Sequence, residues 1–379
     1  DQEMATKGLG QGLLVGLMCG MGSGLLIRLL LGTVVGAFDL GGAAAAHAMA
    51  YLSTLCWLCP PVGVMLAATH ALRGIGDTRT PFYAMVVVNL VNLGLSWLFV
   101  FGPAPWGGMG VRGLALGTVL AWVVGMVVVL AFLLLRDGRA KDGDGVELSL
   151  RRCRLAPEWP MMKRILRVGA PQALEMLGMW AIHSVTLRFV AGLAPDGTLG
   201  AHLIAIRVES MSFLPGLAIG TAGAALTGQY LGAQNPEKAA RAVRVCWRYA
   251  ALLMTLFGVL FLVWPEELVR VIVPGEGADV ALLVSIAAPL VFLCGLNQPV
   301  LATALVLKSS LRGAGATRLV MTYSFATMIV FRGILVPVAV TCFGAGLFAI
   351  WVIMFVDVWV QAGVFSWVHF RGRWTETDV

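Results

Sequence analysis

The chain has 379 residues, of which 59% are hydrophobic and 12% are charged. Water-soluble proteins carry about 25% charged residues, so this composition excludes an ordinary soluble domain. The net charge of +7 does not indicate nucleic-acid binding, because the basic residues lie in short segments beside apolar runs, where insertion into a bilayer already accounts for them. We therefore expect a membrane protein that crosses the lipid bilayer many times and has no nucleic-acid partner.

Ten apolar runs follow one another along the chain, each bounded by charged or turn-forming residues. Each is at least as long as the roughly 20 residues that span a hydrocarbon core. Continuously apolar runs are typical of helices, whereas the strands of a membrane barrel alternate. The predicted fold is therefore all-α and integral to the membrane. The ten predicted helices cover residues 8–36, 42–72, 81–102, 113–135, 165–193, 200–232, 245–265, 280–308, 319–342 and 345–370.

The positions of Lys and Arg predict the orientation of these helices, because basic residues are retained in cytoplasmic loops. If the first helix enters from the cytoplasm, the cytoplasmic segments and the helix ends that border them hold 21 Lys and Arg residues, and the outer loops hold two, Arg112 and Arg270. Four arginines and no lysine are assigned to the interior of the helices, namely Arg28, Arg188, Arg207 and Arg332. We expect both termini to be cytoplasmic and the location to be a bacterial-type plasma (inner) membrane.

A repeated phrase divides the chain into two lobes. "LRGIGDTR" begins at Leu72, and "LRGAGATR" begins at Leu311, 239 residues later. Internal repeats in membrane transporters usually mark two related halves with the substrate between them. The only long polar connection, residues 136–164, is the predicted cytoplasmic linker. It separates an N-terminal lobe, residues 1–135, from a C-terminal lobe, residues 165–379.

The repeat also predicts that the first lobe is incomplete. When the two phrases are aligned, the four upstream helices match the last four downstream helices, and the helices at 165–193 and 200–232 have no upstream counterpart. Residue 1 is not Met, and "DQEMATK" aligns with the polar turn "PEKAARAVR" at 236–244. We therefore expect two helices to be missing before residue 1, although a genuine ten-helix protein is an alternative.

The chain resembles the multidrug and toxic compound extrusion (MATE) transporters. The resemblance implies twelve helices in two six-helix lobes, of which ten are present here. It also implies a monomeric antiporter that exports cationic amphipathic molecules in exchange for H⁺ or Na⁺ by alternating access, without any other cofactor. The order and spacing of several phrases carry the resemblance, namely the two repeated phrases above, "NLVNLGLSWLFVFG" (89–102), "GVRGLALGT" (110–118), "APQALE" (170–175) and the segment 200–239.

Two carboxylates near mid-membrane are the main candidates for ion exchange. At 1.5 Å per residue, Glu175 and Glu209 lie about 15 Å and about 14 Å along neighbouring predicted helices. A desolvated carboxylate holds its proton until a cation approaches, so H⁺ and a cationic substrate would compete for it. Glu175 matches an acidic position of the MATE seventh helix, but it could instead be tied to a neighbouring polar side chain. Glu209 could instead form an internal ion pair, with Arg207 and His202 close by in sequence.

Four further residues of the second lobe are candidates for the substrate or cation site. Asp357 lies near mid-depth and could act in coupling or simply pair with Arg332. His183, two turns beyond Glu175, could share its cavity or pack as an ordinary core histidine. Asn297 and Gln298 precede a proline that bends their helix, which favours a cavity-facing pair.

The first lobe matches the family pattern less well. In members with a cation site there, an Asn is followed four residues later by an Asp, with a Thr on the next helix and an Asp on the first helix. Asn92 and Thr118 match, but the Asp position is Ser96 and the first helix is absent. The resemblance therefore leaves a first-lobe site in doubt.

Other classes of function fit less well. The seven cysteines are scattered, no zinc spacing is present, and HExxH and GxSxG phrases are absent, so we expect neither a metal site nor an enzyme. A lipid-linked oligosaccharide flippase of related architecture is the main alternative, but it would need a cavity rich in basic residues. A truncated protein that does not transport is the third possibility.

Overall fold

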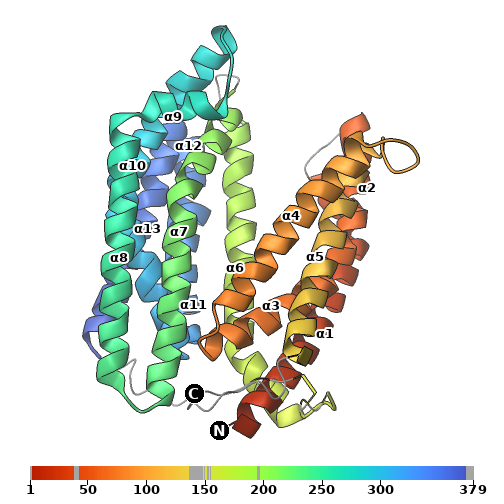
Figure 1. Ribbon diagram of the computed structural model, residues 1–379. Helices are drawn as coiled ribbons and strands as arrows, with labels where there is room; N and C mark the ends of the chain where they lie inside the picture. Colours follow the sequence, from red (N-terminus) through yellow and green to blue (C-terminus); the bar gives the residue numbers. More distant parts are fainter. Residues whose placement is uncertain are drawn as a thin grey trace. The chain divides into compact units, whose positions relative to one another are not determined.

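The computed structural model describes residues 2–37, 42–135, 148, 150–151, 153, 155–193 and 197–372. The chain folds into two compact units, Asp1–Leu166 and Arg167–Val379. Every regular element in the described residues is a helix (Figure 1).

In its described residues the first unit contains five whole α-helices, one short 3₁₀ turn and the first residues of α6, most of which belongs to the second unit. Its core lies between α1, α3, α4 and α5, where Leu13, Met65, Val88 and Leu133 are buried together. The bounds are α1 Gln2–Ala37, α2 Gly42–Leu55, η1 Cys56–Leu58, α3 Cys59–Gly74, α4 Arg79–Phe101 and α5 Gly110–Leu135.

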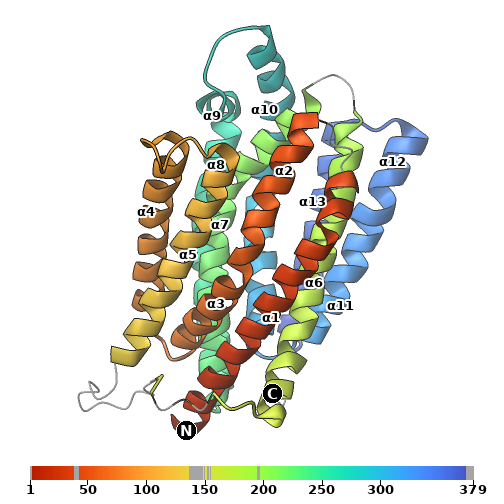
Figure 2. The same cartoon turned by 90° about the vertical axis from the view of Figure 1, so that its right-hand side faces the viewer.

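The second unit is built around one long helix, α10, which packs against α7, α8 and α13. Two buried clusters follow α10 along its length, one around Trp351 and Phe261 and the other around Leu311 and Phe365. The bounds are α6 Trp159–Ala191, α7 Thr198–Gly232, α8 Pro236–Val263, α9 Pro265–Ile272, α10 Ala278–Gly313, α11 Thr317–Met328, η2 Ile329–Leu335, α12 Val336–Phe343 and α13 Leu347–Phe370. In Figure 2, α11 and α12 follow one another as a single rod.

The predicted all-α membrane fold is confirmed. Nine helical stretches in the described residues are long and apolar enough to cross a membrane. The tenth predicted run, 165–193, forms α6 but is not among the nine, since α6 is less apolar and carries several charges: Lys163, Arg164, Arg167, Glu175 and Arg188. The short helix α9, Pro265–Ile272, was not predicted.

Two predicted runs are interrupted where proline removes a backbone donor. The run 42–72 changes from α2 to α3 through a 3₁₀ turn immediately before Pro60 and Pro61. The run 319–342 contains a π-helical segment, Ile329–Leu335, followed by Pro337. Because Pro337 cannot donate to the carbonyl four residues earlier, the wider π turns accommodate the break.

Several helices begin earlier than the apolar runs predicted. The segment "PEKAARAVR" is not a turn but the start of α8, where Asn235 caps the helix by accepting a hydrogen bond from the Lys238 backbone N–H at 3.1 Å. Pro236 at the first helical position and Glu237 in the first turn suit a helix N-terminus. Likewise α6 begins at Trp159, inside the segment predicted as linker.

Glycines allow α1 and α3 to approach closely. A Cβ atom on Gly16 would lie 2.5 Å from the carbonyl oxygen of Gly63, and one on Gly20 would lie 2.5 Å from that of Cys59. Membrane helices associate through such small residues because lipid provides no hydrophobic force to hold helices together. The glycine spacing on α1 therefore determines how closely α1 and α3 pack.

We expect Gly16→Ala to force α1 and α3 apart and to destabilise the first unit by about 1–3 kcal/mol, the usual cost of overpacking. Thermal unfolding in an uncharged detergent measures this. Gly22→Ala is the matched control on the same helix, because a Cβ there meets nothing within 4 Å. Equal unfolding temperatures for the two variants would contradict the close contact.

Candidate functional site

The side chain of Glu175 is held between two basic residues of α10. Its Oε1 lies 2.6 Å from Lys308 Nζ, and its Oε2 lies 2.8 Å from Arg312 Nη2. The carboxylate side chain is 4% exposed, and the two basic side chains are 18% and 16% exposed. Buried ionic groups are tolerated only when they are paired, so these contacts explain how the carboxylate remains inside the bundle.

The length of α10 brings the two basic residues to this position. The helix continues to Gly313, beyond the predicted end at 308, so Lys308 and Arg312 lie four residues apart on one face. The expectation that the helices contain no lysine is therefore wrong. With two cations around one carboxylate, this part of the unit carries excess positive charge.

Asp357 on α13 is fully buried and paired with Arg332. Arg332 Nε donates to Asp357 Oδ2 at 2.7 Å, and Gln361 Nε2 donates to Oδ1 at 2.8 Å. This is the ion pair considered as one of two possibilities from the sequence. Arg332 lies in the π-helical segment η2, and π segments in helices frequently coincide with functional positions.

Glu209 on α7 differs from the other two acids because it has no direct partner among the described residues. It is half-buried and makes no hydrogen bond or ion pair there. The expected alternative, an internal pair with Arg207 or His202, does not occur: Arg207 is exposed and His202 bonds elsewhere. Glu209 is instead within electrostatic range of Arg332, which Asp357 already engages directly.

Together these six side chains form what we call the charge network: Glu175, Glu209, Asp357, Lys308, Arg312 and Arg332. Lys308 is also within electrostatic range of Asp357. This interaction links the ion pairs around Glu175 to the ion pair of Asp357 and Arg332. Three acids thus face three bases, but unevenly. Two bases surround Glu175, whereas two acids share Arg332.

His202 and His183 lie in an aromatic row rather than in an ion pair. Trp351 Nε1 donates to His202 Nδ1 at 3.0 Å, so the hydrogen of the neutral ring is on Nε2, which has no partner although the residue is fully buried. His183 stacks on His202 with ring centroids 6.5 Å apart and meets Trp180 edge to face. The structure therefore joins His183 to His202 more directly than to Glu175.

Asn297 and Gln298 are buried inside the bundle. Asn297 Oδ1 accepts from Trp359 Nε1 at 2.9 Å, and Gln298 Oε1 accepts from the Ser212 hydroxyl at 2.7 Å. Their amide nitrogens have no partner in the described part of the chain. Unmet buried donors are costly and are usually met by water or a ligand, so both residues remain candidates for a binding role.

In the first unit the structure brings Asn92 and Thr118 together. Asn92 Nδ2 donates to Thr118 Oγ1 at 3.1 Å, across α4 and α5. Ser96, one turn after Asn92, is buried with an unpartnered hydroxyl. The contact is present, but it contains no carboxylate to hold a cation.

Among the described residues, no group of three His, Cys, Asp or Glu side chains could hold a metal ion. No binding-site role was expected from the sequence for Lys308, Arg312, Gln361, Trp351 and Trp359. All five bond to residues that were candidates. Lys308 and Arg312 stand at the edge of an apolar run, where a basic residue looks like a topology signal.

The fold and the candidate spans define an integral membrane protein made of two helical units. The MatE family profile matches residues 1–98 and 171–338. The chain is 29% identical over 343 residues to a probable multidrug resistance protein NorM of Thermotoga maritima, covering 90% of this chain and 70% of that protein. It is 27% identical over 294 residues to a NorM protein of Mesorhizobium japonicum, covering 74% of this chain and 59% of that protein.

Solved structures show the same fold. A MOP superfamily transporter from Pyrococcus furiosus, described as having a binding pocket of reverse polarity, superposes with a TM-score of 0.84 at 19% identity. The match covers all of this chain and 86% of that one. Because the family profile matches more than half of the chain, the chain belongs to the MatE family.

Glu175→Gln should destabilise the second unit, because it leaves Lys308 and Arg312 buried without a counter-charge. Breaking a buried pair by removing one partner typically costs about 3–5 kcal/mol. Thermal unfolding in detergent measures the loss, and Glu237→Gln on the exposed start of α8 is the matched carboxylate-to-amide control. Adding Lys308→Gln restores the net charge of the group and should recover part of the loss. If Glu175→Gln unfolded at the wild-type temperature, that result would argue against the two buried ion pairs of Glu175.

Proposed function

We propose that this chain is a secondary active exporter of small molecules that uses a gradient of H⁺ or Na⁺. It is a transporter and not an enzyme, and it works by alternating access as a monomer in the plasma (inner) membrane with both termini in the cytoplasm. Membership of the MatE family supports the transport class. The charge network supports the ion exchange, because it leaves the Glu209 carboxylate without a direct partner.

The single observation that carries the mechanism is the unpartnered carboxylate of Glu209. A cation that approaches Glu175 meets Lys308 and Arg312 first, and like charges at close range in a low-dielectric interior repel strongly. A cation that approaches Glu209 meets two acids that share one arginine. The exchange site therefore belongs at Glu209, and Glu175 takes the other role considered from the sequence, that of a carboxylate tied to neighbouring side chains.

Competition at one carboxylate explains the coupling. When H⁺ or Na⁺ neutralises Glu209, a cationic amphipathic substrate loses its counter-charge and leaves; when the ion departs, the substrate can bind again. A substrate and an ion that exclude each other at one group allow the gradient of one to drive the other, provided that both open states expose the group. His183 on α6 and His202 on α7 are further polar groups of the same unit.

The full chain in proteoliposomes, loaded with ethidium as a fluorescent organic cation, tests this proposal under an imposed H⁺ or Na⁺ gradient. Glu209→Gln should abolish gradient-driven ethidium movement, because an amide cannot exchange a proton or hold Na⁺ by charge. Glu209→Asp should retain part of it, and Glu267→Gln, an exposed carboxylate on α9, should behave as wild type.

The readout that separates exchange from folding is thermal stability. Glu209 makes no direct bond to lose, so we expect Glu209→Gln to unfold at the wild-type temperature. Gradient-driven ethidium transport at the wild-type rate in a well-folded Glu209→Gln variant would remove this residue from the mechanism.

A further inference from the structure

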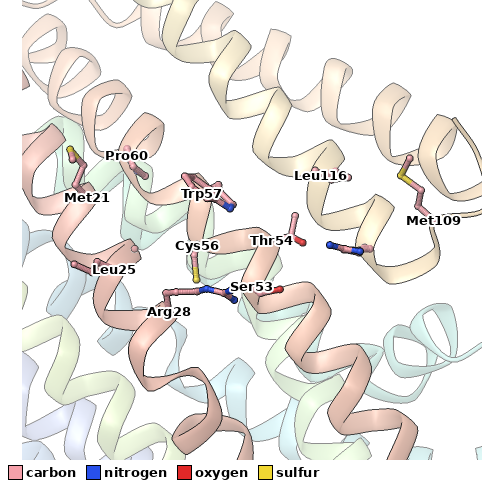
Figure 3. A pocket seen from close by; sticks show the side chains of 12 residues that line it. Met21, Leu25, Arg28, Ser53, Thr54, Cys56, Trp57, Pro60, Met109 and Leu116 are labelled. Atoms are coloured by element: carbon pink, nitrogen blue, oxygen red, sulfur yellow. The ribbon is translucent and has the colours of Figure 1, made fainter.

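A pocket of the first unit lies between α1, the junction of α2 and α3, and the start of α5 (Figure 3). Its lining is mostly apolar and includes Met21, Leu25 and Trp57. By the repeat of 239 residues, α1 corresponds to α8 and α2 with α3 corresponds to α10, and these are the helices on which α7 packs in the second unit. The lining therefore suits a contact with the expected counterpart of α7. The second unit contains α7 itself, so its buried polar groups need another explanation.

Two neighbouring side chains inside the second unit each have a hydrogen-bond donor without an acceptor. Asn297 and Gln298 follow one another on α10 and are 1% and 0% exposed. In the described part of the chain, neither Asn297 Nδ2 nor Gln298 Nε2 has a hydrogen-bond partner. A buried amide N–H without an acceptor costs free energy, and two of them side by side call for an acceptor that reaches them in another state of the protein.

The oxygen end of each amide is already engaged, which leaves the nitrogen end for that acceptor. Trp359 Nε1 donates to Asn297 Oδ1 at 2.9 Å, and an indole N–H can only donate, so this amide keeps its nitrogen turned away from Trp359. The Ser212 hydroxyl donates to Gln298 Oε1 at 2.7 Å. A Cβ atom on Gly258 of α8 would lie 3.2 Å from Gln298 Cβ, so the stem of Gln298 has no room to swing toward α8.

Glu209 lies about one helical turn from both amides, along the contact between α7 and α10. On α7, Ser212 follows Glu209 by three residues, a rise of about 4.5 Å. On α10, Cys294 is within electrostatic range of Glu209, and the two amides follow Cys294 by three and four residues on the same face of the helix. An ionised carboxylate offers only acceptor sites, which is what two unpartnered N–H donors require.

We propose that Asn297 and Gln298 are positioning residues for Glu209, whose ionised carboxylate accepts from Asn297 Nδ2 and Gln298 Nε2 when it holds neither a coupling ion nor a substrate. This inference rests on the proposed exchange at Glu209 and adds the state in which that site is empty. Hydrogen bonds to the charged form lower the free-energy cost of an ionised carboxylate inside the bundle. A protonated or cation-bound carboxylate is a weaker acceptor, so either ligand releases Glu209 from the amides to the half-buried position described above.

Ethidium binding to the full chain in an uncharged maltoside detergent tests this docking, with ethidium fluorescence as the readout. Two pairs of variants isolate one amide each. Trp359→Phe keeps the Asn297 amide, and Trp359→Phe/Asn297→Leu removes it. Ser212→Ala keeps the Gln298 amide, and Ser212→Ala/Gln298→Met removes it. Each double variant loses both partners of one hydrogen bond, so it strands no buried group, and thermal unfolding establishes that every variant is folded.

Each double variant should bind ethidium roughly tenfold more tightly than its single-variant control, because ethidium no longer competes with a hydrogen bond to the carboxylate. A purely structural role of the amides would instead weaken ethidium binding or leave it unchanged. In a Glu209→Gln background the two members of each pair should bind equally, since no carboxylate remains to dock.

Infrared difference spectroscopy at alkaline pH provides a readout that does not depend on ethidium. The carboxylate stretching bands of Glu209 are those that Glu209→Gln removes from the ethidium-free protein. We expect these bands to shift between Trp359→Phe and Trp359→Phe/Asn297→Leu, because the number of donors to a carboxylate changes its stretching frequencies. Ser210→Ala is the matched control and should leave the bands unchanged, since the Ser210 hydroxyl donates to the Arg207 carbonyl within α7.

The outcomes separate the docking from the exchange mechanism. If Glu209→Gln weakens ethidium binding but both pairs show equal affinities, the exchange site stands and the docking is overturned. If Glu209→Gln binds ethidium like the wild type, the exchange site is wrong, and unshifted Glu209 bands would then overturn the docking as well. Competition by Na⁺ against ethidium in Ser212→Ala but not in Ser212→Ala/Gln298→Met would make Gln298 a cation ligand through its oxygen, which would also overturn its role as a donor.

Discussion

The balance of buried charge in the second unit constrains everything else about that unit. Three acids and three bases are held inside a bundle whose other buried residues are mostly apolar, and each ionised group is tolerable only because others compensate for it. The compensation is uneven in space: direct ion pairs hold Glu175 and Asp357, whereas Glu209 relies on an arginine that is already occupied.

The two units hold their buried polar side chains in different ways. In the second unit, basic residues meet acids on neighbouring helices. In the first unit, the described residues pair Asn92 with Thr118 through neutral groups. The first unit therefore holds these polar side chains without charge, whereas the second unit balances charge against charge.

The sequence was sufficient for the fold because the bilayer imposes long apolar runs, and these can be counted. It was less informative at helix ends, where the apolar run stops but the helix continues, as at Pro236 and Trp159. The acidic candidates were found because a carboxylate inside an apolar run is conspicuous. Lys308 and Arg312 were not expected beside Glu175, because basic residues at the end of an apolar run look like topology signals. The bonds from Trp351 to His202 and from Trp359 to Asn297 depend on which helix faces which, and no local pattern contains that information.

The π-helical segment Ile329–Leu335 has a consequence for how this chain could diverge from its relatives. A π turn contains one residue more than the α turn it replaces, so deletion of a single residue there would return the helix to regular geometry. The turns on either side would keep their directions, because the π segment absorbs the extra residue, while the side chains within the segment would point in new directions. Arg332 would turn away from Asp357 without either residue being substituted. A one-codon loss would thus leave a buried aspartate with only Gln361 as its partner, and the electrostatics of the whole bundle would have to be rebuilt around it.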